Sequence, residues 1–199
     1  MDATDDYLAA ALPTGTRVLG VRLPVYKFGH AVWLRRLKSQ FTESSAKHLT
    51  HGDLLLALGI LRREDPADCP RRLQAWIRWK TWLTRRLSHD TWHAEKVRLL
   101  SWLLRQEAMP RCSIPEDSKG KSGAPWLLRM KTTLMRELNL TDRQIELRPM
   151  REAIWEHAVI LEAGGLIQIH TKEDEEILEL ARQREAEKQR KEPVHARQG

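Results

Sequence analysis

The sequence predicts an all-α protein, a multi-helix bundle with at most one short β element. Three observations support this fold class. Apolar residues recur at helical spacing through most of the 199 residues. Capping residues and prolines stand at the starts of several of these stretches. The strand-like patterns are short, and the two of them, at about 17–25 and 165–170, are expected to pair with each other.

The composition agrees with this class. Hydrophobic residues make up 41% and charged residues 31% of the chain, a balance typical of a soluble helical protein. The apolar run at 54–61 is far shorter than a membrane span, and residues 1–10 lack the features of a signal peptide. Cys69 and Cys112 lie far apart without metal-ligand spacing, which predicts two reduced thiols. We therefore expect a cytoplasmic protein with no membrane partner.

The first part of the chain predicts an N-terminal helical domain at 17–108, preceded by a flexible N-terminus at 1–16. The valines of residues 17–26 favour a short strand or extended arm, and Pro24 restricts it to the edge of a sheet. A helix is expected next, at about 29–38, because its apolar residues fall on one face.

Further helices complete this domain. Thr50 and Asp53 have the spacing of a capping box, which predicts a helix ending at about residue 63. Pro70 suits the first position of a helix running to about residue 87. Another helix is expected to end at about residue 108.

Residues 109–124 mark the clearest boundary in the chain. Proline, glycine, serine and charges of both signs crowd together there, which predicts a flexible loop or linker. A C-terminal helical subdomain is expected at 125–170, with a second capping box formed by Thr141 and Gln144. Residues 171–199 predict an exposed charged helix and tail, with acids in the first turn and bases in the last.

No combination of nucleophile, base or metal ligands indicates an active site, so we expect no catalytic residue, metal site or cofactor. His89 and His93 stand four residues apart, which would place both on one helix face, but no third metal ligand follows at a readable spacing. His30 stands just inside a predicted helix start with no Ser, Cys or Asp beside it. We expect a structural role for it.

The stretch at 71–87 is the strongest candidate for binding nucleic acid. Its basic side chains could contact phosphates while Trp79 or Trp82 stacks on bases. An amphipathic core helix with a solvated basic face would show the same pattern. The candidate phosphate contacts are Arg71, Arg72, Arg78, Lys80, Arg85 and Arg86.

The segment LPVYKFGHAVWLRRLKS at 23–39, followed by the leucine-rich helix at 53–61, resembles small helical proteins of phage and prophage tail gene clusters. In that group a Gly-His pair marks a helix start rather than a catalytic site. Residues 125–170 resemble the C-terminal part of the same group, with a Trp-led helix, a Thr-x-x-Gln helix, a proline-initiated helix and a glycine ending. The resemblance covers 17–63 and 125–170, and the middle at 70–124 carries no feature of the group.

Proteins of that group are usually placed as tail assembly chaperones, which coat the tape-measure protein until tail-tube subunits polymerise around it. The resemblance implies a non-enzymatic morphogenesis protein of the bacterial cytoplasm that binds an elongated helical partner. Such a chaperone needs amphipathic helices and aromatic contact surface. Eight tryptophans exceed what one core of this size needs, so we expect one or two to be partly exposed. The expected partner contacts are Trp76, Trp79, Trp82, Trp102 and Trp126. A nucleic-acid-binding adaptor built on residues 71–87 is the alternative.

Overall fold

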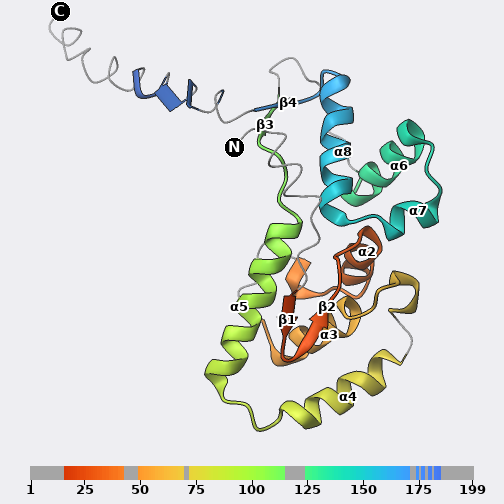
Figure 1. The fold of residues 1–199 in the computed structure, drawn as a ribbon, viewed down its shortest axis with the longest axis vertical. Coiled ribbons are helices and arrows are strands. Elements are labelled where there is room, and N and C mark those ends of the chain that lie inside the picture. The colour runs from red at the N-terminus through yellow and green to blue at the C-terminus, as the bar shows by residue number, and fades with distance from the viewer. Residues whose placement is uncertain are drawn as a thin grey trace, which may run out of the picture.

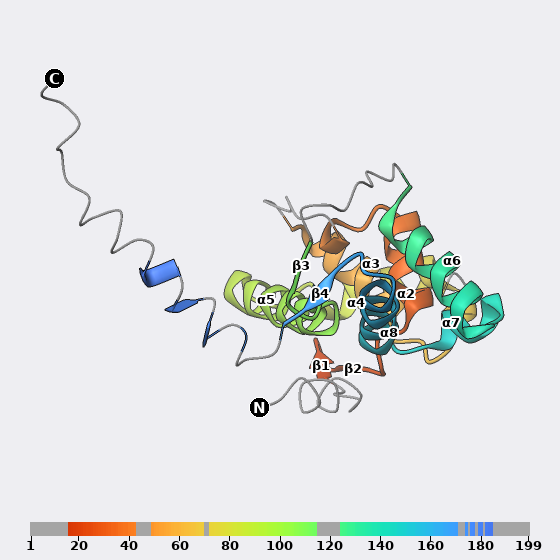
Figure 2. The same cartoon turned by 90° about the horizontal axis from the view of Figure 1, so that it is seen from above.

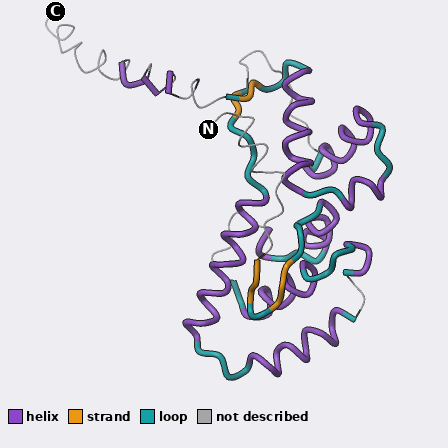
Figure 3. The backbone as a smooth tube through the Cα atoms, in the orientation of Figure 1, coloured by secondary structure: helices purple, strands orange, loops and turns teal. Residues whose placement is uncertain are grey.

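The protein is described here by a computed structural model, which describes residues 16–42, 49–69, 72–114, 124–170, 174, 176, 177, 179, 180 and 182–184. Figure 3 shows that helices make up most of this part of the chain, which confirms the all-α class. In chain order the elements are β1 (Thr16–Val18), β2 (Val21–Leu23), α2 (Phe28–Arg36), η1 (Gln40–Thr42), α3 (His51–Leu61), η2 (Pro66–Asp68), α4 (Leu73–Thr84), α5 (His89–Gln106), β3 (Cys112–Ser113), α6 (Trp126–Leu138), α7 (Asp142–Leu147), α8 (Met150–Ala163) and β4 (Gln168–Ile169).

The expected pairing between 17–25 and 165–170 is wrong: the first segment folds into a hairpin with itself, and the second pairs with part of the predicted linker. Strand β1 pairs antiparallel with β2 through a two-residue turn at Leu19 and Gly20. Both turn residues have positive φ, 48° and 73°, which is the backbone of the type I′ turn that suits a tight hairpin. Strand β4 pairs instead with β3, which lies inside the predicted linker at 109–124. Part of that linker is therefore ordered, and residues 115–123 lie outside the described residues.

Both predicted capping boxes are confirmed. The Thr50 hydroxyl accepts a hydrogen bond from the Asp53 N–H, and the Asp53 carboxylate accepts one from the Thr50 N–H. Thr141 and Gln144 exchange the same pair of bonds at the start of α7. These bonds satisfy backbone donors that a helix N-terminus leaves without a partner.

The start of α4 differs from the prediction. The helix begins at Leu73, and its N-cap Arg72 has left-handed backbone angles with φ of 54°. A helix cannot continue backwards through a left-handed residue, so the predicted start at Pro70 is wrong. Pro70 and Arg71 themselves lie outside the described residues.

One hydrophobic core joins the first part of the chain to the last. Ahead of α2, Tyr26 C=O accepts a hydrogen bond from Met150 N–H at 2.8 Å, and Phe28 N–H donates to Arg148 C=O at 2.9 Å. This backbone pairing places α2 against α7 and α8. The predicted domain at 17–108 and the predicted subdomain at 125–170 share this core, whose buried members include Phe28, Leu34, Leu58, Ile60, Leu99, Met130, Leu134, Ile145 and Ile154.

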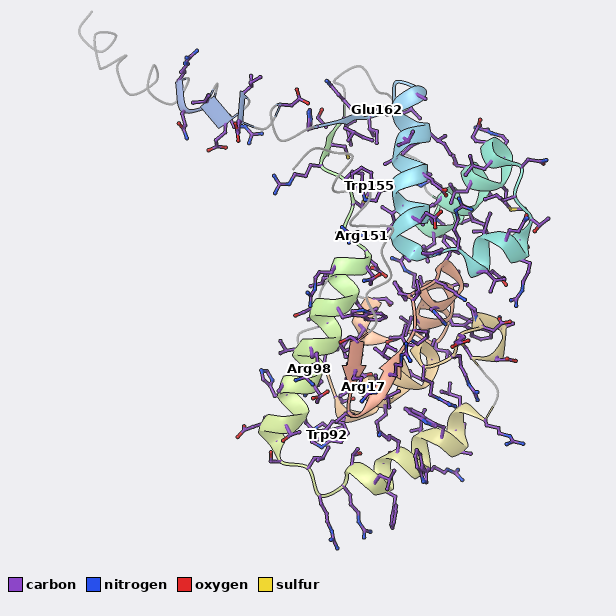
Figure 4. The ribbon with its side chains drawn as sticks, in the orientation of Figure 1. Arg17, Trp92, Arg98, Arg151, Trp155 and Glu162 are labelled. Carbon is purple, nitrogen blue, oxygen red and sulfur yellow. The ribbon has the colours of Figure 1, made fainter. Side chains whose placement is uncertain are left out.

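The longer helices surround this core on several sides (Figure 1). Helix α5 lies on one side of α8, and α6 and α7 lie on the other, as Figures 1 and 2 both show. Helix α4 crosses one end of the molecule, and the sheet of β3 and β4 lies at the opposite end (Figure 1). Near that sheet, Glu162 on α8 accepts a hydrogen bond from Ile169 N–H at 2.8 Å (Figure 4). Of the described helices, none combines the length and apolar character that crossing a membrane requires.

Candidate partner-binding surface

The Gly-His pair at the start of α2 lies in the core of the fold. A Cβ atom at Gly29 would lie 2.6 Å from the Cβ of Pro66 and 3.0 Å from the carbonyl oxygen of Glu146. Neither a proline ring nor a backbone carbonyl can turn aside as a flexible side chain can. The first turn of α2 therefore approaches η2 and α7 so closely that only glycine fits.

His30 is fully buried, and both of its ring nitrogens have partners. Nδ1 accepts a hydrogen bond from Lys27 N–H at 3.1 Å, so Nε2 carries the proton and donates to Arg63 C=O at 2.9 Å. Burial lowers the pKa of His30 from its ordinary value of 6.5 to about 4, although the hydrogen bond to Arg63 opposes this shift. A neutral ring with both nitrogens occupied has no free position for proton transfer, which fits the predicted structural role.

The other predicted histidine pair forms no metal site among the described residues. His89 and His93 are exposed, and His89 Nδ1 lies 3.9 Å from an Asp90 carboxylate oxygen that is itself exposed. Within the described ranges, no group of three His, Cys, Asp or Glu side chains could hold a metal ion. A nearby histidine has a packing role, because His51 stacks on Trp92 with ring centroids 4.1 Å apart. Figure 4 shows Trp92 at the end of α5 nearest α4.

One face of α4 packs against α3. Leu73 is buried and Trp76 is half-buried, and both lie over Gly59, where an added Cβ would come within 2.4 Å of the leucine and 3.1 Å of the indole. The Arg62 guanidinium lies 4.8 Å from the centre of the Trp76 ring. On the same helix, Lys80 Nζ donates to Leu19 C=O at 2.8 Å in the turn of the hairpin. These contacts fix the rotation of α4 about its axis.

Beside this packed face α4 has an exposed flank, and we call it the tryptophan face. Trp79 is 54% exposed and Trp82 is 58% exposed. Leu83 in the last turn of α4 and Leu87 in the loop after it are exposed as well. The guanidinium of Arg85 lies 5.4 Å from the centre of the Trp82 ring. Two neighbouring tryptophans more than half exposed are uncommon, because indole rings are usually buried in cores or interfaces.

The remaining predicted contact tryptophans are less accessible. Trp102 is only 3% exposed and packs on Tyr26 at 5.9 Å, so the prediction that it contacts a partner is corrected: it is a core residue. Trp126 is half-buried, with the Arg35 guanidinium 5.6 Å from its ring centre. Trp76 is half-buried against α3. Trp79 and Trp82 are thus the two predicted contacts that are well exposed, in line with the expectation of one or two exposed tryptophans.

The candidate phosphate contacts are also unequal. Arg72, Arg78, Arg85 and Arg86 are exposed, whereas Lys80 is half-buried by its bond to the hairpin turn, and burial lowers the pKa of its ammonium. Arg71 lies outside the described residues. Residues 71–87 contain no Asp or Glu, so the tryptophan face lies in a strongly basic setting.

The helical spacing of Leu83 and Leu87 with Leu73, Trp76 and Ile77 predicts one apolar stripe along the helix. In the structure Leu83 and Leu87 are exposed, and Leu87 lies beyond the end of α4. The exposure of the tryptophan face could not be inferred from spacing, because either face of α4 could have met α3. No protein-family model, curated protein or solved structure matches this chain.

Proposed function

We propose that this protein is a non-enzymatic binding protein that holds an elongated helical partner on the tryptophan face of α4. The single observation that carries this proposal is the exposure of Trp79 and Trp82 side by side on a helix that its packing on α3 fixes to the body. Large aromatic side chains in such positions supply the central contacts of many protein interfaces.

The size of this surface suits reversible binding. Covering the exposed half of an indole removes about 100 Å² from water, which contributes about 2–3 kcal/mol for each tryptophan. Association itself costs at least about 4 kcal/mol in lost translational and rotational freedom. The two indoles therefore offset that cost only narrowly. Covering the exposed Leu83 and Leu87 contributes further binding free energy. A holding chaperone needs such moderate affinity because it must release its client.

The chemistry of the surface selects the partner. A basic surface with an apolar centre complements a helix that carries an apolar stripe between acidic residues. Together with the resemblance at 17–63 and 125–170, this supports a phage or prophage tail assembly chaperone that binds the tape-measure protein or another tail protein. Under this proposal the protein works in the cytoplasm of the bacterial host.

Co-purification tests the proposal. The tagged full chain is expressed with its genomic neighbours, purified at moderate salt with nuclease present, and the retained proteins are identified. We expect a long helical protein to be retained, and its recovery to fall more than tenfold in the Trp79→Ala/Trp82→Ala variant. A control variant, Leu128→Ala/Leu138→Ala, removes two exposed apolar side chains from α6 and should retain the partner.

Thermal unfolding of the same variants separates binding from folding. Both variants should keep the wild-type melting temperature within a few degrees, because exposed side chains contribute little to stability. Equal recovery of the partner with and without the two tryptophans would overturn the proposal.

A second candidate function is nucleic-acid binding, favoured by the four exposed arginines around the tryptophan face. Phosphate contacts release counterions, so an oligonucleotide should then bind with an affinity that falls steeply with salt. Fluorescence anisotropy with a labelled single strand at 20–300 mM salt measures this. Binding that the Arg78→Glu/Arg85→Glu variant abolishes would establish this function, and no binding at low salt would remove it.

A further inference from the structure

The C-terminal segment carries acidic charge, opposite in sign to the charge around the tryptophan face. Residues 173–180 read EDEEILEL, with five acidic and no basic side chains. Ile177 is 65% exposed and Leu180 is 54% exposed, and their spacing of three residues places them on one side of a helix. Glu176 and Glu179 lie beside them. We give the name acidic helix to the described helical residues within 174–180, namely Asp174, Glu176, Ile177, Glu179 and Leu180.

We propose that the acidic helix of one copy of this chain docks on the tryptophan face of a second copy and occupies it until the client protein displaces it. This inference rests on the proposed function, since it takes the tryptophan face to be a docking surface. The inference names the segment that occupies the tryptophan face before the client binds, and it makes client binding a competition with that segment.

Charge complementarity argues for this occupant. The stretch that contains α4 carries Arg71, Arg72, Arg78, Lys80, Arg85 and Arg86 and no acid, whereas residues 173–180 carry Glu173, Asp174, Glu175, Glu176 and Glu179 and no base. Each segment carries charges of one sign around exposed apolar side chains. Docking would pair the charges at the rim and remove both apolar stripes from water.

The geometry of the chain argues for a second copy rather than the same molecule. Strand β4 and His170, the last residue described before the acidic helix, lie at the opposite end of the molecule from α4 (Figure 1). Helix α5 has 18 residues and is about 27 Å long, and it leads from the end of α4 toward the sheet of β3 and β4. The four chain steps from His170 to Asp174 reach at most roughly 14 Å, and the helical rise from Asp174 to Leu180 adds about 9 Å, so the total stays below the length of α5 alone. The acidic helix therefore cannot reach its own α4 while β4 stays paired with β3.

Exchange between two copies gives a closed assembly. If each copy places its acidic helix on the other, both tryptophan faces are covered and no docking surface is left over. The second contact forms within the complex and so gains from a high effective concentration, which lets two weak contacts hold a dimer. A client with an acidic, apolar helix competes for the same surface.

Charge reversal tests the inference by sedimentation velocity at 1–100 μM protein. The wild type should form a dimer, and the Arg78→Glu/Arg85→Glu and Glu176→Arg/Glu179→Arg variants should each dimerise at least tenfold more weakly. A chain with all four substitutions should recover dimerisation, because the charges are exchanged rather than lost. The control Arg129→Glu/Arg136→Glu changes two exposed arginines on α6 at the same spacing of seven residues and should dimerise like the wild type.

The outcomes separate this inference from the proposed function. A wild type that is monomeric throughout, or a dimer that neither reversal weakens, overturns the inference whatever the co-purification shows. Glu176→Arg/Glu179→Arg leaves the tryptophan face intact, so this variant should also retain several-fold more client than the wild type. Unchanged client recovery in this variant would likewise overturn the regulatory part, whereas loss of client only on removing the tryptophans would leave the proposed function standing.

Discussion

Replacing His30 with glutamine should remove a pH dependence that the buried imidazole gives to the stability of the whole fold. A glutamine side chain can still donate to Arg63 C=O but cannot take up a proton. It loses the acceptor that Nδ1 offers to Lys27 N–H, and a lost buried hydrogen bond costs about 1–3 kcal/mol. The variant should therefore be less stable than the wild type at pH 7.

The pKa of His30 sets the size of the effect. At pH 7 the ring is largely neutral in both the folded and the unfolded chain. Below pH 6.5 the unfolded chain takes up a proton that the folded chain refuses until about pH 4, so the free energy of unfolding falls with the pH. The loss is about 2 kcal/mol by pH 5 and about 3 kcal/mol by pH 4.

Urea unfolding between pH 7 and pH 4, followed by tryptophan fluorescence or circular dichroism, measures this loss. Other groups also weaken the fold in acid: burial lowers the pKa of His157, and hydrogen bonding to Arg143 lowers the pKa of Asp65. The wild type and His30→Gln share these groups, so their difference in the free energy of unfolding should change by about 3 kcal/mol from pH 7 to pH 4. The advantage of the wild type at pH 7 should therefore close or reverse by pH 4. His93→Gln, at an exposed position, should follow the wild type. A gap that stays constant over this range would refute the assignment of a buried neutral imidazole.

Three further predictions concern packing. Gly29→Ala should lower the free energy of unfolding by about 2 kcal/mol in a urea titration, because overpacking against η2 exceeds the gain in helix propensity. The control Gly52→Ala should be neutral or stabilising, because the nearest atom to its new Cβ lies 3.6 Å away. Trp76→Ala should lower the free energy of unfolding by about 2–4 kcal/mol, far more than removing both exposed tryptophans, and a smaller loss would contradict its packing on α3. Burial raises the pKa of the Cys69 thiol to about 12, so a disulfide reagent should label one thiol per native chain, Cys112, and two after denaturation; rapid labelling of both would contradict the burial.

The helices could be predicted because their signals are local. A capping box needs only two residues three apart, and both boxes form as the sequence predicts. Apolar spacing likewise placed most helix ends within a few residues of those observed. The errors lie in the strand pairing, because strands of two or three residues carry little signal for which partner they take. Strand β1 pairs with its neighbour β2 across a two-residue turn, and β4 pairs with β3 in the supposed linker.

The candidate surface was only half predictable. The sequence singled out Trp79 and Trp82 but gave the same weight to Trp102, whose indole packs on Tyr26 across 76 residues of chain. The sequence likewise predicts Lys80 and the neighbouring arginines as equal phosphate contacts, yet the Lys80 ammonium donates a hydrogen bond to Leu19 C=O in the hairpin turn. Which face of a helix is covered depends on what packs there, and sequence spacing alone does not contain that information.

By itself the sequence determined the helical class, the caps, the lone cysteines and the opposed charges of residues 71–87 and 173–180, because these depend on neighbouring residues or on composition. The tertiary structure decided how the parts of the chain share one core, why the Gly-His pair is required, and which tryptophans remain exposed. Each of these depends on contacts between segments far apart in the chain, and such contacts are settled by packing and by the satisfaction of buried polar groups. On α4 this packing leaves the tryptophan face exposed, and the proposed function rests on that face.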